Sequence, residues 1–481
     1  MSTTFVKSPT SLLRLGHAHG DTTPPVGIYH RMWGAARHDA ATGVHRPLQA
    51  NVIVLEPLSG DNDTRFVRVQ LELVNLTGEQ MDRLAANVGE ATGTPAERVL
   101  FTFSHSHASG NYAPGRRGLP GGDLIGPFLD DLNAKVTSLA ESALSSVEET
   151  AITYAFGRCD MAQNRDYCDE ANGIYATGYN PDRSGEDTVL VGRVTNASGE
   201  VRLVIVNYAC HPTTLAWDNT LISPDYVGAL REVIETNTGA PCCFLQAPSG
   251  DLGPRDGFVG DTAVADRNGK QVGHAALSAL YGMGAPYHDF AYAGPVVSGA
   301  TIGTWTWEMQ ENDRAEETAV FRGGCFEVAL PLIDLPTQET LQADMKRYAE
   351  EQETADQDGD KIKARDTGAM AERCRRWLAR IEALPEGKAF AYRFTVFQLG
   401  DAVWVTCGGE PYSWLQSELR SRFPDLTIMV SSLSGDTQVA YLLREEDYGK
   451  GLYQEEPSAL AKGCLERLAD AIAERIAEVV G

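Results

Sequence analysis

Two histidines one residue apart follow an apolar run, and residues of this type at this spacing could bind a metal ion or polarise a carbonyl group. The run begins at Val99 and is typical of a strand, and His105 and His107 come directly after it. In extended backbone alternate side chains share a face, so we expect both imidazoles to point the same way. Small neighbours leave room for an ion or a substrate. A pair of ordinary surface histidines is the alternative, because a His-x-His pair alone is a weak motif.

Two further predicted strands also end in residues that could bind a metal ion. His211 follows the apolar run Val201 to Tyr208, and Glu410 follows the run Ala402 to Cys407. Pro411 suits the first residue of a helix, so Glu410 is expected at a strand-to-helix junction. Two imidazoles and a carboxylate with space for water form the hydrolytic zinc arrangement, although composition alone does not select this set.

The elements before His105 are expected to place it at the edge of a sheet. A strand is predicted from Phe66 to Val74, and Thr77 and Gln80 form a capping-box start for the helix that follows. Together with the run from Val99, this order makes a β-α-β unit. Ligands of open α/β sheets gather beyond the carboxyl ends of the strands, which is where the histidine pair would lie.

The remaining pattern predicts an α/β fold with a mixed β-sheet core flanked by helices. The paired runs Phe390 to Leu399 and Ala402 to Cys407 must be antiparallel, and a long amphipathic helix is expected from about Pro457 to Val479. We expect residues 1–481 to form a single domain, with residues 337–387 inserted in it as a polar helical hairpin. A polar hairpin of this kind could form a contact between two copies of the chain, so a homo-oligomer remains an alternative to a monomer.

Charge and composition limit the class of partner. The 481 residues carry a formal net charge of −25, which argues against nucleic acid and against stable association with an anionic membrane. No apolar run approaches the ~18 residues of a membrane span, and the first residues lack the apolar core of a signal peptide. We therefore expect a cytoplasmic protein. Its expected partner is a small-molecule substrate. The nine cysteines show no C-x-x-C pair and are expected to be reduced.

Five short motifs together resemble the neutral/alkaline, non-lysosomal ceramidase family. Their order and rough spacing agree over about residues 15 to 460. The motifs are Ser104-His105-Ser106-His107-Ala108-Ser109-Gly110, Ala209-Cys210-His211-Pro212-Thr213-Thr214, Gly250-Asp251-Leu252-Gly253-Pro254, Gly409-Glu410-Pro411, and Tyr441 with Glu445-Glu446-Asp447-Tyr448 and Tyr453.

This resemblance implies one zinc ion in a catalytic domain. The implied zinc ligands are His105, His211, Glu410 and Tyr441. The implied residues of the reaction centre, which donate protons or bind a carbonyl group, are His107, Arg165 and Tyr453. A tyrosine ligand would be weak and able to move aside, or would donate to a developing oxyanion.

The chain departs from the family pattern in ways that affect its expected substrate. Gly253 stands where the family has a serine, so no mechanism can use that hydroxyl, and Ser249 is a poor stand-in. The chain resembles the catalytic domain only, because no immunoglobulin-like domain is recognised after Tyr453, and no secretion signal is recognised before it. These departures favour a small polar substrate over ceramide.

Three functions follow from these observations. The first is a zinc-dependent hydrolase that cleaves an amide, or alternatively an ester or lactone, by attack of metal-bound water. The second is a metal-dependent lyase or isomerase acting on a polar sugar-like or acidic substrate, which the missing serine favours. The third, a binding protein without catalysis, is the weakest because it has no need of His107, Arg165 and Tyr453 together.

Overall fold

An eight-stranded mixed sheet forms the centre of the molecule. The computed structural model describes residues 4–60, 64–310, 312–434 and 439–481. The strand order is β14-β12-β11-β7-β2-β4-β5-β6, and the outer pairs β12/β14 and β5/β6 are parallel whereas the inner pairs are antiparallel. The strands are β2 (Thr10–Asp21), β4 (Gln49–Glu56), β5 (Phe66–Leu71), β6 (Val99–Phe103), β7 (Glu148–Arg158), β11 (Thr188–Asn196), β12 (Val201–Tyr208) and β14 (Cys242–Gln246).

A second, four-stranded sheet packs face to face on the first. Its order is β18-β19-β20-β22, with β18 (Phe321–Pro331), β19 (Ala389–Leu399), β20 (Ala402–Cys407) and β22 (Thr427–Ser431). The shared core contains residues such as Ile53 and Ile205 from the first sheet and Trp404 and Met429 from the second. Alternate side chains of each strand therefore face the other sheet, while the remaining ones face helices.

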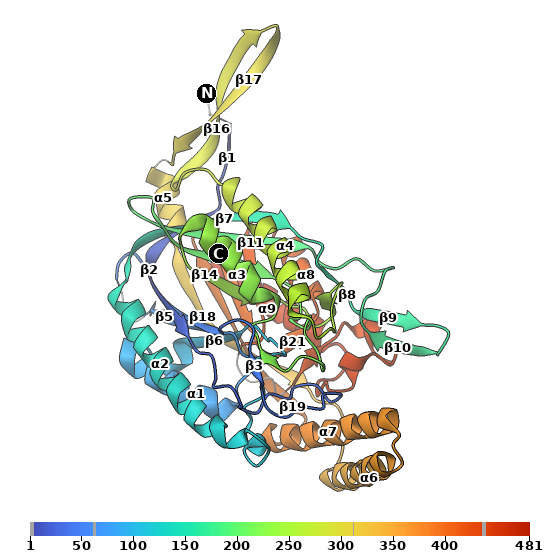
Figure 1. The fold of residues 1–481 in the computed structure, drawn as a ribbon. Coiled ribbons are helices and arrows are strands. Elements are labelled where there is room, and N and C mark those ends of the chain that lie inside the picture. Colours follow the sequence, from blue (N-terminus) through green and yellow to red (C-terminus); the bar gives the residue numbers. More distant parts are fainter. Residues whose placement is uncertain (1–3, 61–63, 311, 435–438) are drawn as a thin grey trace.

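Helices cover the two outer faces, so the molecule has four layers in the order α/β/β/α (Figure 1). Four helices pack on the eight-stranded sheet: α1 (Gly78–Thr92), α2 (Ile125–Ser145), α3 (Tyr226–Thr238) and α4 (Thr262–Tyr281). The four-stranded sheet packs against α8 (Trp414–Arg422) and α9 (Cys464–Val480). The predicted fold class, a mixed α/β core flanked by helices, is confirmed.

Local sequence signals account for the unit that leads to His105. Thr77 accepts a hydrogen bond from the Gln80 backbone nitrogen while the Gln80 side chain accepts one from the Thr77 backbone nitrogen, which is the predicted capping box. The helix α1 ends at Gly93, whose φ of 64° suits glycine. The strands β5 and β6 on either side are parallel, so the predicted β-α-β unit is present.

The late hairpin is antiparallel as predicted, but it belongs to the second sheet and not to the central one. The strand β20 is largely apolar and buried on both faces, as are β4 and β5 of the central sheet, so the sequence pattern does not distinguish the two sheets. The last helix, α9, begins at Cys464 and not near Pro457, because the segment before it is held in irregular structure on Pro331 and Tyr441.

The predicted helical hairpin is present as α6 (Gln338–Gln357) and α7 (Lys361–Ala383). Both helices are largely polar, and α6 lies at the outside of the molecule (Figure 1). The second helix packs on the body: Arg116 of the loop before α2 pairs with Glu372 of α7, and both side chains are buried. The hairpin is thus fixed to the body through α7.

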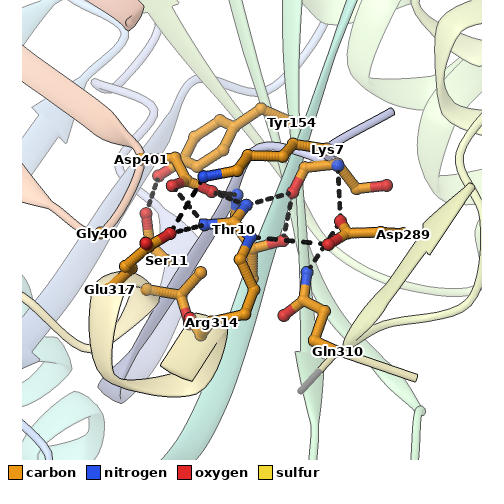
Figure 2. A network of polar contacts seen from close by, with 12 residues as sticks. Lys7, Thr10, Ser11, Tyr154, Asp289, Gln310, Arg314, Glu317, Gly400 and Asp401 are labelled. Carbon is orange, nitrogen blue, oxygen red and sulfur yellow. Dashed lines mark hydrogen bonds and ion pairs between the residues drawn. The ribbon is translucent and has the colours of Figure 1, made fainter. Parts of the chain in front are cut away.

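A β-hairpin arm projects from the body and was not predicted (Figure 1). Its strands β16 (His288–Ser298) and β17 (Ala300–Met309) pair with each other, and β1 (Phe5–Val6) adds to β16. Figure 2 shows the polar network at its base, where Arg314 of α5 (Asn312–Thr318) pairs with Asp289 of β16 and with Asp401 of the β19–β20 turn. The arm is therefore anchored to both sheets.

Short elements connect these layers. The remaining strands are β3 (Gly43–Val44), β8 (Ala162–Asn164), β9 (Asp166–Asp169), β10 (Ile174–Thr177), β13 (Leu221–Ile222), β15 (Leu252–Pro254), β21 (Glu410–Pro411) and β23 (Tyr441–Leu442), and the 3-10 helices are η2 (Ala96–Arg98), η3 (Pro114–Arg116), η4 (Gly122–Leu124), η5 (Glu445–Asp447) and η6 (Tyr453–Glu455). In the described ranges no helix has both the length and the hydropathy needed to cross a bilayer. All nine cysteines are free thiols, and seven of them are buried.

Candidate metal centre and active site

His105 and His107 converge, but for a reason other than the one expected. His105 lies beyond the end of β6 and takes a left-handed backbone conformation with φ of 67°. Such a conformation is uncommon outside glycine and marks a position held by its surroundings. His105 Nδ1 donates to the carbonyl oxygen of Val74 at 2.8 Å, which fixes the ring. The ring centroids of His105 and His107 are then 4.9 Å apart in a turn, not in an extended strand.

His211 is held in the same manner at the end of β12. Its Nδ1 lies 2.8 Å from the carbonyl oxygen of Ser249, and its Nε2 lies 2.9 Å from Oε2 of Glu410. Burial lowers the pKa of His211 to about 4, so the ring is neutral at pH 7 and carries one proton. A backbone carbonyl oxygen can only accept, so that proton sits on Nδ1 and the Nε2 lone pair faces the carboxylate.

Glu410, which follows a strand of the second sheet, contacts both His105 and His211. It lies in β21, which follows β20 and pairs in parallel with β23, so that Glu410 stands beside Tyr441. Its Oε2 is also 3.5 Å from Nε2 of His105. Burial alone would raise the pKa of this carboxyl group, but the neighbouring His105 and His211 outweigh it and hold the pKa well below its usual range. Glu410 is therefore an ionised carboxylate.

The residues present fit a metal ion. Ligating nitrogens of His105, His107 and His211 all lie within 4.8 Å of one another. Nε2 of His105 and Nε2 of His211 both face Oε2 of Glu410, so three atoms of the kind that ligates zinc converge in one buried place. Ligand atoms of a tetrahedral zinc site are about 3.3 Å apart, close to the spacings from Glu410 to both rings. The three histidines His105, His107 and His211 form one possible ligand set, and the expected set has Glu410 and Tyr441 in place of His107. Both sets contain His105 and His211.

His107 has a free nitrogen in a buried place. Its Nε2 is enclosed and has no hydrogen-bond partner among the residues that the structure describes. Burial, and then the neighbouring His105 and His211, hold the pKa of His107 well below its usual range, so the ring is neutral. The Trp33 ring packs on it at 5.1 Å between centroids. A neutral imidazole with a free nitrogen can accept a proton or bind a metal ion.

Arg165 and Tyr441 form the polar wall beside Glu410. The guanidinium of Arg165 is buried and donates to the carbonyl oxygen of Gly250 from both Nε and Nη2, and its Nη2 lies 3.1 Å from the Tyr441 hydroxyl. The Tyr441 ring stacks on His211 with 6.1 Å between centroids. Tyr441 therefore stands between the cation of Arg165 and the convergent histidines.

Tyr453 lies at the outer side of the same group. Its ring is 5.9 Å from the ring of Tyr441, and 49% of the residue is exposed to solvent. The exposed part is the side of the ring, and burial of the hydroxyl end raises the pKa of Tyr453, with Arg376, Glu410 and Arg165 as the next groups that act on it. All seven residues predicted for the site thus lie around one centre, with Tyr453 on its open side.

Ser249, which precedes the family loop, and Gly253, which lies in it, are both close to the site. Ser249 is buried, accepts at its hydroxyl from Gln246 Nε2 at 2.6 Å, and lies on the Nδ1 side of His211. It faces away from the convergent nitrogens, so it does not replace the missing serine. A side chain added at Gly253 would first meet Arg165 Cδ at 3.6 Å, which is an ordinary contact. The site therefore has room for a serine that this chain lacks.

An aromatic wall on the His107 side was not predicted. Trp33 contacts Phe258 and Trp217 edge to face, with centroids 5.7 and 6.2 Å apart. Trp217 is 37% exposed, so the wall extends from His107 to the surface. These three residues lie in loops of irregular structure with no sequence periodicity, and only their aromatic character could have drawn attention to them.

Comparison with solved structures places the fold among the ceramidases. The chain superposes on a structure described as ceramidase complexed with C2 with a TM-score of 0.63 and 14% identity, covering 98% of this chain and 75% of that one. It superposes on neutral ceramidase from Pseudomonas aeruginosa with a TM-score of 0.62 and 15% identity, covering 98% and 74%. No family model and no curated protein sequence matches. The chain therefore shares the neutral ceramidase fold at a low level of sequence identity.

Proposed function

We propose that this protein is a zinc-dependent hydrolase that cleaves an amide bond of a small polar substrate, with an ester or lactone as related substrates. The zinc ligands in this proposal are His105, His211, Glu410 and Tyr441. We place the activity in the cytoplasm, in keeping with a net charge of −25 and the composition of the chain.

One observation carries the proposal. The Glu410 carboxylate lies 2.9 Å from a lone-pair nitrogen of His211 and 3.5 Å from Nε2 of His105. In each ring the other nitrogen, Nδ1, donates a hydrogen bond to a backbone carbonyl oxygen. Histidines that ligate a metal ion are oriented in this way in metalloenzymes. Structural stability alone gives no reason to bring these three groups together, because each would be better solvated apart.

The residues around the metal centre can supply the proton transfers and the charge stabilisation that hydrolysis of an amide requires. A zinc ion bound there supplies a Lewis acid for the substrate carbonyl and lowers the pKa of water. The neutral His107 accepts a proton at Nε2, and Tyr453, on the open side, donates one to the leaving group. Arg165 keeps the Tyr441 hydroxyl in place and stabilises negative charge that develops beside it.

The second candidate function is a metal-dependent lyase or isomerase acting on a polar sugar-like or acidic substrate. Gly253 in place of the family serine favours it, because a mechanism that uses that hydroxyl is closed to this chain. Mass spectrometry of products formed in ¹⁸O-labelled water separates the two candidates. Incorporation of the label at the cleaved carbonyl supports a hydrolase, whereas a product with the same composition as the substrate supports an isomerase.

Metal content tests the proposal first. Protein purified without added metal is expected to contain about one zinc per chain by elemental analysis, and His105→Ala and Glu410→Ala are expected to lose it. A panel of short amides, esters and lactones is then tested with and without chelator. Absence of metal, or a metal that both variants retain, would refute the zinc hydrolase.

A further inference from the structure

We propose that Arg380 of α7 forms an anion-binding subsite at the metal centre, so that the substrate is an amide that also carries an acidic group such as a carboxylate. This inference rests on the proposed hydrolase, whose substrate class it specifies. Its basis is the position of α7, the second helix of the predicted polar hairpin.

The helix α7 lies between two segments that border the site. Arg376 Nη2 donates to the carbonyl oxygen of Met32 at 2.6 Å, and Met32 precedes Trp33, whose ring packs on His107. Trp377 Nε1 donates to Glu456 at 3.0 Å, and the Glu456 backbone nitrogen donates to the carbonyl oxygen of Tyr453. The face of α7 that carries Arg376 therefore closes the site between Trp33 and Tyr453.

Arg380 follows Arg376 by one helical turn, so both lie on this face. Its guanidinium packs on the Trp377 ring at 5.0 Å from the centroid, and the residue is partly buried. Burial lowers its pKa, and Glu410 and Tyr453 are the first two groups that act against this shift. The cation of Arg380, seated on Trp377, thus lies close enough to Glu410 and Tyr453 to act on both.

No hydrogen-bond acceptor is assigned to the Arg380 side chain within the described part of the chain. Its neighbours differ in this respect, because Arg373 pairs with Glu456 and Arg376 pairs with Glu372. A guanidinium has five N–H donors, and leaving them without acceptors in a partly desolvated place is unfavourable. A substrate carboxylate supplies two acceptor oxygens in the geometry that a guanidinium prefers.

The charge around the subsite also favours an anion. Arg165 and Arg380 border one small region of a protein with a net charge of −25, whereas Arg376 there is paired with Glu372. The carboxylates of Glu410 and Glu456 also act on Arg380. A bound divalent cation would add to this positive region, and only Glu410 of the predicted ligands carries a full negative charge. Positive potential confined to the site of an acidic protein attracts a small acidic substrate and repels cationic ones.

Matched amides test the subsite in the zinc-loaded full-length protein. The hexanoyl amides of glycine and of 4-aminobutyrate carry a carboxylate at two distances from the amide, whereas the hexanoyl amide of ethanolamine is neutral. The variants are Arg380→Gln, Arg380→Lys and, as a control, Arg365→Gln. The control removes an exposed arginine of α7 whose ion pair, among the residues that the structure describes, is with its neighbour Asp366. The measurement is kcat/KM for each amide, or Kd by calorimetry where no amide is cleaved.

Wild type and Arg365→Gln are expected to prefer one of the two anionic amides by about 10- to 100-fold, the value of a charged hydrogen-bonded pair. Arg380→Gln is expected to remove this preference while kcat/KM for the neutral amide stays within about twofold, and Arg380→Lys is expected to retain part of it. Equal use of neutral and anionic amides by wild type, or a preference that survives in Arg380→Gln, would overturn the subsite.

The two proposals fail in different ways. If no amide is cleaved but the carboxylate strengthens binding in an Arg380-dependent manner, the hydrolase is wrong and the subsite stands. If the neutral amide is cleaved and Arg380→Gln has no selective effect, the hydrolase stands and Arg380 is only a structural partner of Trp377.

Discussion

Nε2 of His211 lies 2.9 Å from Oε2 of Glu410, although 199 positions separate the two residues in the chain. His211 follows β12 of the eight-stranded sheet and Glu410 follows β20 of the four-stranded sheet. The two sheets pack face to face, so their strand ends meet at one edge and bring a neutral imidazole against a carboxylate. This contact joins the two halves of the chain into one candidate site.

The roles of His107 and Tyr453 can be separated from those of the ligands. We expect His107→Ala and Tyr453→Phe to keep about one zinc per chain, because neither belongs to the proposed ligand set. His107→Ala is expected to lower kcat by about 10²- to 10⁴-fold, as for loss of a general base. Elemental analysis for zinc and measurement of kcat on the same preparations check the expected zinc content and the expected loss of rate. Loss of zinc from His107→Ala, with zinc retained in Glu410→Ala, would instead indicate the three-histidine site.

Restoring the family serine should be tolerated. In Gly253→Ser the new Cβ meets Arg165 Cδ at 3.6 Å and Thr213 Oγ1 at 3.8 Å, and the backbone does not require glycine. We expect the midpoint of urea unfolding to stay within error of wild type. We also expect kcat to change by less than about tenfold, because the proposed mechanism needs no hydroxyl there. An increase of 10²-fold or more would show that the hydroxyl takes part in proton transfer and that this chain has lost it.

Acid should destabilise the protein through histidines outside the site. His30 is buried, with Nε2 bonded to the Ala108 carbonyl oxygen, and burial lowers its pKa to about 4 from the usual 6.5. The unfolded chain therefore binds this proton more readily, and the stability that the neutral ring provides is present above pH 6.5 and is lost as the pH falls toward 4. For one such group the loss is at most ~3 kcal/mol.

Urea unfolding at pH 7.5, 6, 5 and 4 measures this dependence. His30→Gln is expected to show a smaller loss of stability with falling pH than wild type. His274→Gln, at an exposed position of α4, serves as the control and should retain the wild-type slope. Parallel slopes for His30→Gln and wild type would contradict the assignment of a buried neutral ring to His30.

Local signals in the sequence predict the elements that carry the site. The Thr77 capping box, the strand from Val99 and the late antiparallel hairpin all depend on residues close together in the chain, and each is present. The seven residues that the resemblance to ceramidases indicated lie around one centre, and their roles stay predictions. Each of the short motifs with His105, His211 and Glu410 follows the end of a strand, so strand prediction and motif together point to these residues, whereas their meeting depends on how the two sheets pack.

Other features depend on contacts that local sequence does not contain. The left-handed backbone of His105 is held by Val74, and the separation into two sheets depends on which faces pack together. Arg380 was not selected because a charged residue in a polar helix is typical of a solvated face. Its position became clear only from the contacts of Arg376 and Trp377 with distant loops.

The β-hairpin arm should depend on Arg314 for its attachment. Arg314 is buried and pairs with Asp401 and Asp289, while Lys7 at the edge of the same network is about half exposed and pairs with Glu317 (Figure 2). Removing one partner of a buried ion pair costs about 3–5 kcal/mol, whereas an exposed pair contributes less than about 1 kcal/mol. We therefore expect Arg314→Leu to lower the free energy of unfolding by several times more than Lys7→Ala.

Limited proteolysis shows whether this loss is local to the arm. In Arg314→Leu we expect faster cleavage in residues 288–318, since Asp289 and Asp401 then face each other without a cation. Adding Asp401→Asn should recover part of the stability, because it removes one of the two uncompensated charges. Equal cleavage rates in wild type and Arg314→Leu would mean that the β1–β16 pairing and the aromatic packing of Phe290 and Trp307 hold the arm without this ion pair.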